Sequence, residues 1–318
     1  MIKVLVVCSF NSGKVAPFIK EQVNSLKQFG TSIDYYLIQG KGPVGYLKNY
    51  FPLLEKLKQF KPNIIHAHYG YSGLLSLLQR IIPVVCTFHG TDVSLPQNRI
   101  LSFLVSRLAK ENIFVHSSQP RLLKYEKTIN LIPCGVDMNR FHPIDRNQAR
   151  LKLKLDLKKK YILFSSSFNN AIKNYPLAKK AIQILGDNIE LIELKNYSRT
   201  EVNLLMNSCD ALLVTSHSET GPLVVKEAMA CNCPVISVDV GNVRELVYGV
   251  SNCCIVDPFP EEIAAAIMNI VSIDKRSSGR VKLLQIKDRM EDVARRIIRI
   301  YHRIVFPDGK SVKIPFEF

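Results

Sequence analysis

The chain has 318 residues, with 43 lysines and arginines against 27 aspartates and glutamates, eight cysteines and no tryptophan. This length corresponds to about two domains of ordinary size. Apolar residues make up 47% of the chain, which excludes a disordered protein, and no apolar run reaches the roughly 18–20 residues that span a bilayer.

The first apolar stretch, Ile2–Val7, is only as long as a strand and contains Lys3, unlike the core of a signal peptide. We therefore expect a cytoplasmic protein. There is no Cys-x-x-Cys pattern, and no cluster of histidines accompanies any cysteine pair. The cysteines are accordingly expected to be reduced structural thiols rather than a zinc or redox site.

In the first half of the chain, short β-branched runs alternate with longer stretches of helical period. The predicted strands are Lys3–Cys8, Ile33–Ile38, Ile64–His68, Val84–His89, Ile113–Ser117 and Asn130–Pro133. The predicted helices are 17–29, 44–60, 72–80, 98–110 and 119–126. This alternation indicates βαβ units and a parallel sheet that is covered on both faces.

A break rich in proline and glycine lies near Pro133–Pro143, and the alternation then restarts. The predicted strands of the second half are Tyr161–Ser166, Glu190–Leu194, Ala211–Ser216, Pro234–Asp239 and Cys254–Asp257. The predicted helices are 145–153, 175–185, 200–208, 222–231 and 260–272. We predict two doubly wound, Rossmann-like α/β domains, 1–138 and 139–287, that face each other across a cleft.

The segment Asp288–Val305 is predicted to form one helix that packs back onto the first domain. Its apolar residues recur every three or four positions, and Arg296, Arg299 and Arg303 form a stripe on the other face. This stripe is either a solvated face or a contact with an anionic surface.

The formal net charge is +16, and residues 1–140 contribute +10 of it, from 17 basic and 7 acidic side chains. Phosphates, acidic glycans, an anionic membrane surface and nucleic acid are all candidate partners for such a chain. Composition does not choose among them.

The stretch Thr215–Ala230 contains the most informative pattern. A predicted strand leads into a polar turn, and a helix is expected from about Pro222. The N–H groups of Leu223 and Val224 would have no partner inside the helix and, with the helix dipole, would form an anion site. Glu219 and Glu227 would flank that site and suit sugar hydroxyls, whereas the alternative is two ordinary surface carboxylates.

Glu219-x7-Glu227, followed by Ala-Met-Ala, resembles the signature of retaining family 4 glycosyltransferases, which have the GT-B fold. Other segments resemble motifs of the same family. These are Asn11-Ser-Gly13, His89-Gly-Thr-Asp92, Ile132-Pro-Cys-Gly-Val-Asp137 and Gly241-Asn-Val-Arg-Glu245. The resemblance covers nearly the whole chain.

The resemblance implies roles for the second domain. Glu227 would bind the ribose of a nucleotide-sugar donor, and Glu219 would hold the donor sugar near the reacting carbon. Further donor contacts are implied for Lys173, Asn174, Gly221, Pro222, Leu223 and Val224. A fixed cation and helix N–H groups would stabilise the charge of the departing phosphate, so no metal or other cofactor is expected.

In the first domain, the resemblance implies that His89 acts at the donor sugar and that Gly13 lets the backbone approach the phosphate or the acceptor. Two positions depart from the family pattern. Phe168 lies near the position where the family commonly has an arginine of the diphosphate clamp, so the clamp would consist either of Lys173 with neutral donors or of Lys173 with an arginine from elsewhere in the chain. Pro222 removes one N–H from the donor loop.

Taken together, the sequence predicts a retaining glycosyltransferase with a nucleotide-diphosphate sugar donor and a glycan or lipid-linked acceptor, acting in surface polysaccharide or cell-envelope biosynthesis. A lipid-linked acceptor would place the enzyme at the inner face of the plasma membrane. The first-domain lysines that could attract it to an anionic surface are Lys20, Lys27, Lys48, Lys56, Lys58 and Lys61.

Two alternatives remain open at this stage. A sugar-nucleotide epimerase can share two facing α/β domains, and it would convert the donor without an acceptor. A basic nucleic-acid-binding module is the other, but no RNA-binding or helix-turn-helix motif is visible and the basic residues are not interleaved with aromatic ones. We therefore expect no nucleic-acid partner.

Overall fold

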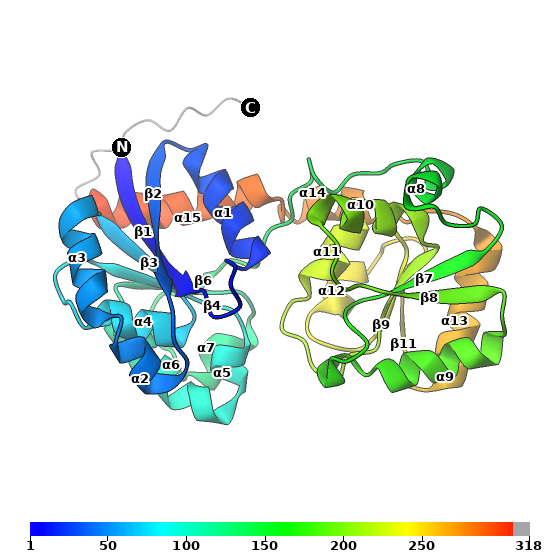
Figure 1. Ribbon diagram of the computed structural model, residues 1–318, viewed down its shortest axis with the longest axis horizontal. Helices are drawn as coiled ribbons and strands as arrows, with labels where there is room; N and C mark the ends of the chain where they lie inside the picture. Colours follow the sequence, from blue (N-terminus) through cyan, green and yellow to red (C-terminus); the bar gives the residue numbers. More distant parts are fainter. Residues whose placement is uncertain (308–318) are drawn as a thin grey trace. The chain divides into compact units, whose positions relative to one another are not determined.

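The structure, a computed structural model, describes residues 1–307 and divides the chain into two units. Unit 1 consists of Met1–Gly135 together with the chain from Met290 onward, and unit 2 is Val136–Arg289. Each unit is an α/β domain built on one parallel sheet (Figure 1).

The sheet of unit 1 has six parallel strands in the order β2-β1-β3-β4-β5-β6. They are β1 (Ile2–Ser9), β2 (Thr31–Ile38), β3 (Ile64–His68), β4 (Val84–Phe88), β5 (Glu111–Phe114) and β6 (Asn130–Leu131). β3 and β4 are buried along their whole length, as expected of central strands that helices cover on both faces.

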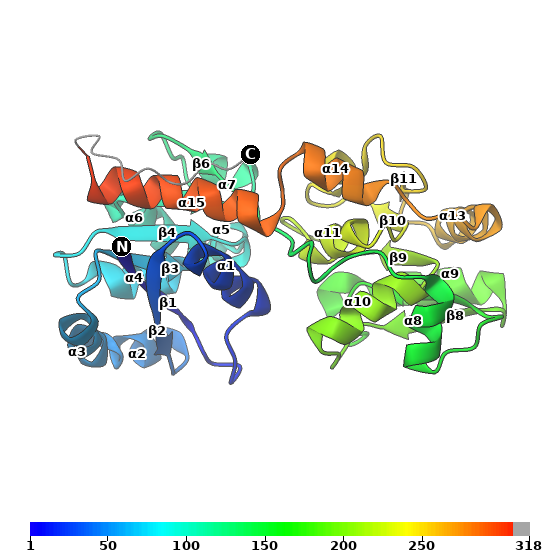
Figure 2. The ribbon, with the colours of Figure 1, turned by 90° about the horizontal axis from the view of Figure 1, so that it is seen from above.

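Unit 1 has helices on both faces of its sheet. They are α1 (Pro17–Lys27), α2 (Gly42–Leu47), α3 (Tyr50–Phe60), α4 (Gly70–Leu77), α5 (Thr91–Ser94), α6 (Pro96–Leu108), α7 (Ser118–Leu122) and α15 (Met290–Val305). α15 packs beside α1, and its buried residues, among them Ile297 and Tyr301, share one apolar cluster with β1 (Figure 2). Leu53 of α3 and Leu75 of α4 belong to a second cluster with Leu5 and Ile65.

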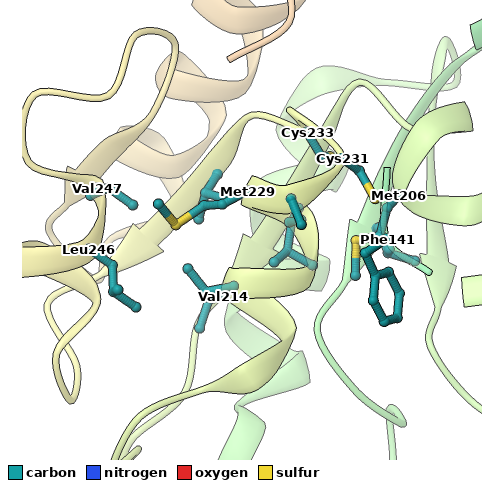
Figure 3. Packing of buried hydrophobic residues seen from close by; sticks show 14 of the residues in the cluster. Phe141, Met206, Val214, Met229, Cys231, Cys233, Leu246 and Val247 are labelled. Atoms are coloured by element: carbon teal, nitrogen blue, oxygen red, sulfur yellow. The ribbon is translucent and has the colours of Figure 1, made fainter. Parts of the chain in front are cut away.

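The sheet of unit 2 has five parallel strands in the order β11-β10-β9-β7-β8. They are β7 (Lys160–Phe164), β8 (Ile189–Glu193), β9 (Ala211–Val214), β10 (Val235–Val238) and β11 (Cys254–Val256). The helices are α8 (Arg146–Leu153), the 3-10 helix η1 (Ala171–Lys173), α9 (Tyr175–Leu185), α10 (Arg199–Ser208), α11 (Leu223–Ala230), α12 (Val243–Val247), α13 (Pro260–Ile273) and α14 (Gly279–Gln285). The larger core cluster of this unit includes Phe141, Met206, Cys231 and Cys233, which lie close together in Figure 3.

The two sheets share one strand order. Counted from the first strand of each unit, both begin 2-1-3-4-5. In this order, the chain leaves the first and third strands in opposite directions, and ligands of such folds bind at that switch point. The predicted α/β fold with two parallel sheets is therefore confirmed.

One predicted helix is divided in two. The stretch 44–60 forms α2 and α3, which are separated at Lys48 and Asn49. The side-chain amide of Asn49 donates to the carbonyls of Gln39 at 2.9 Å and Gly45 at 2.7 Å, so it holds the chain in a turn where the periodicity alone predicts a continuous helix. α14 was not predicted at all.

The predicted domain limits, 138 and 287, lie within three residues of the unit boundaries in the structure. The N–H of Val136 donates to the carbonyl of Asp288 at 3.1 Å, and Val136 forms an isolated parallel bridge with Arg289. The chain passes between the units twice, and the unit 2 residues next to these two connections are therefore hydrogen-bonded to each other. Met138, which the sequence analysis gave to the first domain, packs into the unit 2 core.

Candidate functional site

The switch point of unit 2 lies between the carboxyl ends of β7 and β9, and the loops that follow these strands meet there. The hydroxyl of Thr215, directly after β9, donates to the carbonyls of Lys173 at 2.9 Å and Asn174 at 3.1 Å. The N–H of His217 donates to the carbonyl of Ile172 at 2.8 Å. Three hydrogen bonds thus connect the η1 loop with the turn that carries Glu219.

The amine of Lys173 lies 2.5 Å from Oε1 of Glu219, and the hydroxyl of Ser216 donates to the same oxygen at 2.8 Å. Both charged side chains are largely shielded, with 17% and 13% of their surface exposed. Asn174 has a left-handed backbone, with φ 54°, and its carbonyl accepts from Thr215. The structure thus brings the predicted cation and the predicted sugar-binding carboxylate into direct contact.

α11 begins at Leu223, one residue later than the predicted start, because Pro222 has an extended conformation, with ψ 110°. Leu223 and Val224 are then the first two residues of the helix, whose N–H groups have no acceptor within it. The next N–H, of Val225, donates to the carbonyl of Pro222 at 3.1 Å. The two N–H groups for which an anion site was predicted thus lie at the start of the helix.

Gly241 supports this turn from the loop that follows β10. Its φ is +57°, and a Cβ there would lie 2.9 Å from the carbonyl oxygen of Thr220 and 3.1 Å from Cβ of Glu219. Only glycine combines that backbone conformation with so close an approach. Gly221 is less constrained, since a Cβ there would lie 3.5 Å from the Asn242 side chain, an ordinary contact.

Two buried polar atoms at this edge have no hydrogen-bond partner among the described residues. They are Oγ of Ser165, directly after β7, and Oδ1 of Asn242, beside Gly221. Buried polar atoms are nearly always paired in folded proteins. Hydroxyl groups of a ligand, or water, would satisfy both atoms.

Glu227, the fifth residue of α11, has an arginine partner that the sequence did not reveal. Nη2 of Arg199 lies 2.6 Å from Oε1 of Glu227, and the guanidinium also stacks on the Phe141 ring, 4.6 Å from its centroid. Glu227 keeps only 5% of its side chain exposed. Arg199 follows Ser198, whose capping box with Glu201 starts α10, so the sequence signal marks a helix start rather than a binding residue.

Lys226, next to Glu227, lies on another side of α11. Its amine is buried and lies 2.6 Å from Oδ2 of Asp288, close to the second crossing between the units. Its positive charge is therefore paired with a buried carboxylate inside unit 2.

Phe168 occupies the position where the family pattern commonly has an arginine. Its ring stacks on that of Tyr175 at 4.0 Å and packs against Phe164, as part of an apolar cluster under α9. Its N–H donates to Oε1 of Glu193 at 2.8 Å. An apolar side chain at this position is thus a packing residue.

In unit 1, His89 follows β4 and belongs to a group of three histidines. Nε2 of His89 lies 2.9 Å from Nδ1 of His68, whose ring stacks on that of His66 at 4.5 Å. Nδ1 of His66 is hydrogen-bonded to the hydroxyl of Tyr301 in α15. The backbone N–H groups of His89 and Gly90 donate to Oδ1 of Asp92 at 3.1 and 2.8 Å.

Burial controls the protonation of these groups. It lowers the pKa of His66 to about 3 and, together with the nearby His66, that of His89 to about 3. It lowers the pKa of His68 well below the usual value, with the other two imidazoles adding to the effect. Burial raises the pKa of Asp92 to about 6, although hydrogen bonds from backbone N–H groups act in the opposite direction. At neutral pH, His89 is therefore a neutral imidazole, which suits a hydrogen bond to a hydroxyl.

Gly13 lies in the turn after β1. Its φ is +73°, its N–H donates to the carbonyl of Phe10 at 2.9 Å, and a Cβ there would meet nothing within 4 Å. The glycine thus serves the turn itself. The amide of Asn11 pairs with the backbone of Gly40 in both directions, at 2.9 and 2.8 Å, so the loops after β1 and β2 are joined.

Among residues 1–307, no three histidine, cysteine, aspartate or glutamate side chains gather in a way that could hold a metal ion. No helix in that part of the chain is long and apolar enough to cross a membrane. Arg303 of the α15 arginine stripe has a partner within unit 1, because its guanidinium lies 2.9 Å from Glu111.

Two family profiles match the chain, one in each unit. Residues 2–140 match the family described as Glycosyltransferase Family 4, and residues 185–281 match Glycosyl transferases group 1. The chain belongs to the GT-B glycosyltransferases of these groups. The predicted family is thus confirmed by both units.

Individual proteins agree with this family. A D-inositol 3-phosphate glycosyltransferase of Mycobacterium marinum is 25% identical over 272 residues, which cover 68% of this chain and 57% of the relative. The chain thus spans less than three fifths of that relative's length. Sucrose-phosphate synthase from Thermosynechococcus elongatus has a TM-score of 0.80 at 17% identity, covering 96% of this chain and 99% of the other.

A solved structure of the Anabaena protein HepE in complex with UDP and glucose has a TM-score of 0.73 at 14% identity, covering 95% of this chain and 99% of the other. These similarities show the fold of this GT-B family member.

Proposed function

We propose that this chain is a retaining glycosyltransferase that transfers a sugar from a nucleotide-diphosphate donor to a glycan or lipid-linked acceptor in surface polysaccharide or cell-envelope biosynthesis. One observation supports this most strongly. The switch point of unit 2 combines two helix N–H groups with two carboxylate–cation pairs, Glu219 with Lys173 and Glu227 with Arg199. An anion and sugar hydroxyls need this set of partners.

The donor diphosphate would lie at the N–H groups of Leu223 and Val224, with Lys173 as its cation. Charge grows on the phosphate as it leaves, so donors fixed before the reaction stabilise the transition state more than the ground state. We propose that no metal ion is needed, because a lysine and the helix start supply positive charge at this place. The neutral His89 would hold a hydroxyl of the donor sugar.

Retention would follow a front-face route, in which the departing phosphate helps to deprotonate the acceptor hydroxyl. Glu219 would orient the donor rather than attack it, with its carboxylate accepting a hydrogen bond from the Ser216 hydroxyl. This predicts an α-linked product from an α-linked donor. An inverted anomer in the NMR spectrum of the product would refute retention.

The donor is identified by a thermal-shift screen over UDP-, GDP-, ADP- and dTDP-sugars. A ligand at 100 times its dissociation constant stabilises the folded chain by about 2.7 kcal/mol. Glu227→Ala should abolish the shift, whereas the matched variant Glu262→Ala, on the exposed side of α13, should retain it. Unchanged donor affinity of Glu227→Ala in calorimetry would contradict the ribose role.

Product analysis and a DNA-binding assay separate the alternatives. An epimerase would convert the sugar nucleotide without an acceptor, whereas a transferase needs one. Binding to arbitrary DNA with a steep salt dependence at physiological ionic strength would favour a nucleic-acid-binding protein instead. We further propose a cytoplasmic location, with peripheral contact at the inner face of the plasma membrane.

A further inference from the structure

The segment Gly40–Phe51, here called the α2 platform, presents apolar side chains outward. Val44, Leu47 and Phe51 are 68%, 59% and 75% exposed. Val44 and Leu47 are three residues apart and so share one face of α2, and Phe51 follows in the first turn of α3, after the break at Lys48 and Asn49. The inner side of the platform packs on unit 1, because Tyr46 and Tyr50 lie against the core cluster that contains Leu53 and Leu57 of α3. This segment therefore has two apolar faces, of which only one has a partner within residues 1–307.

The fold imposes the outward orientation. Gly40 and Gly45 approach each other so closely that a Cβ on Gly45 would lie 2.5 Å from the carbonyl carbon of Gly40. The amide of Asn49 donates to Gly45, and the hydroxyl of Tyr36 donates to the carbonyl of Asn49 at 3.0 Å. Specific backbone and side-chain contacts thus fix the position of the platform and the outward orientation of its apolar side chains.

The charge around this face is positive. Residues 39–61 contain five lysines and one glutamate. The amines of Lys41 and Lys48, which flank Val44 and Leu47, make no hydrogen bond or ion pair with any residue in the described part of the chain. In contrast, the amine of Lys56 lies 2.5 Å from Asp34. Two lysines beside the apolar face thus have no counterion among residues 1–307.

A second exposed apolar stripe provides a comparison. Ile100, Leu104 and Leu108 on α6 are 75%, 49% and 66% exposed. The two arginines of α6 are used within unit 1, since Arg99 donates to the carbonyls of Val93 and Ser94 and Arg107 donates to that of Lys124. The α6 stripe is therefore apolar without available charge.

We propose that the α2 platform binds the surface of a bilayer that contains anionic lipid, with Val44, Leu47 and Phe51 among the acyl chains and Lys41 and Lys48 at the headgroups. An apolar helix face with lysines at its border is typical of interfacial binding. A two-fold contact between copies of this chain would instead bring the same lysines together, which like-charge repulsion disfavours.

The position of α2 in the fold of unit 1 also supports bilayer binding. α2 follows β2 directly, at the carboxyl edge of the sheet, and the pairing of Asn11 with Gly40 joins it to the loop after β1. If the proposed function holds, a lipid-linked acceptor would thus reach this edge while its lipid stays in the bilayer. The bilayer contact itself does not depend on that activity.

The lack of tryptophan allows a direct test, since Phe51→Trp introduces a single fluorophore on the platform and Leu104→Trp places one on α6. Vesicles of phosphatidylcholine with phosphatidylglycerol should shift the emission of Phe51→Trp to shorter wavelength, and brominated acyl chains should quench it. Leu104→Trp should show neither change. Equal responses of the two variants, or none from Phe51→Trp, would overturn the proposal.

Vesicle flotation of tryptophan-free variants completes the test. Lys41→Glu/Lys48→Glu should weaken binding by about 25-fold or more, because each basic residue at an anionic surface contributes roughly fivefold. Lys58→Glu/Lys61→Glu, at the far end of α3, has the same charge change and should have a smaller effect. An unchanged Lys41→Glu/Lys48→Glu affinity, or a platform variant that alters oligomeric mass instead of flotation, would refute bilayer binding. A UDP thermal shift in the same variants reports separately on the proposed function.

Discussion

The amine of Lys173 lies 2.5 Å from Oε1 of Glu219, so the cation proposed for the diphosphate and the carboxylate proposed for the sugar form one ion pair. A diphosphate at the start of α11 would compete with Glu219 for this lysine. The two ends of a donor molecule would then be recognised together, since binding the phosphates releases the carboxylate for hydroxyl groups.

Glu219→Gln tests this competition. Because the neutral amide attracts Lys173 less, we expect the affinity for UDP to rise about fivefold, which corresponds to roughly 1 kcal/mol, the upper end of what a surface ion pair contributes. Sugar transfer should fall sharply at the same time. Lys173→Met should lose UDP affinity, and calorimetry measures both. Weaker UDP binding by Glu219→Gln would mean that the carboxylate does not compete with phosphate.

Arg199 and Glu227 form a second pair that is suited to a double-mutant cycle. Removing Arg199 leaves the carboxylate, which is 5% exposed, without this counterion, so Arg199→Met should destabilise unit 2 by about 3 kcal/mol. Glu227→Gln in the same chain should recover much of that loss. Chemical denaturation gives both values, and additive effects would show that the pair is not coupled.

Gly241→Ala should affect binding through the backbone alone. Its φ of +57° and the 2.9 Å approach to the Thr220 carbonyl leave no room for a methyl group, so the Glu219–Thr220 turn must move. We expect a stability loss of about 1–3 kcal/mol and at least a tenfold weaker binding of UDP. Gly249→Ala, which has a φ of +73° but nothing within 4 Å, is the matched control. Equal binding losses in the two variants would point to strain alone.

The histidine group predicts acid instability. The pKa values of His66 and His89 fall from 6.5 to about 3 in the folded chain, so the stability they contribute is present above pH 6.5 and is lost as the pH falls toward 3. His68 acts in the same direction. Asp92 acts oppositely, because its raised pKa favours folding below about pH 4 and this contribution disappears as the pH rises through about 6.

The histidines outnumber the aspartate, so we expect the free energy of unfolding to fall by on the order of 4 kcal/mol between pH 6.5 and 5. Thermal melts across this pH range measure the slope. His66→Gln should flatten it and Asp92→Asn should steepen it. A slope that neither substitution changes would show that these groups do not determine the acid limit.

The parallel sheets and their strands could be read from the sequence because buried strands in such folds are short apolar runs between helices. Glu219 and Glu227 could be proposed from the sequence because they lie close together in the chain around one helix start. Arg199 was missed because it reaches Glu227 from another helix, 28 positions away, and nothing local distinguishes it from a helix-capping segment. The division at Asn49 depends on side-chain hydrogen bonds to Gln39 and Gly45, which periodicity does not report.

The place of α15 in the chain has a consequence for biosynthesis. Unit 2 is a single continuous stretch, whereas unit 1 needs Ile297 and Tyr301 of α15 to cover β1 and α1. A ribosome therefore completes all of unit 2 before unit 1 can close, and until then the apolar face under α15 stays open to chaperones or to aggregation. A fragment that ends at Gly135 would keep that face uncovered, so separate production of unit 1 requires a circularly permuted gene that places α15 next to α1.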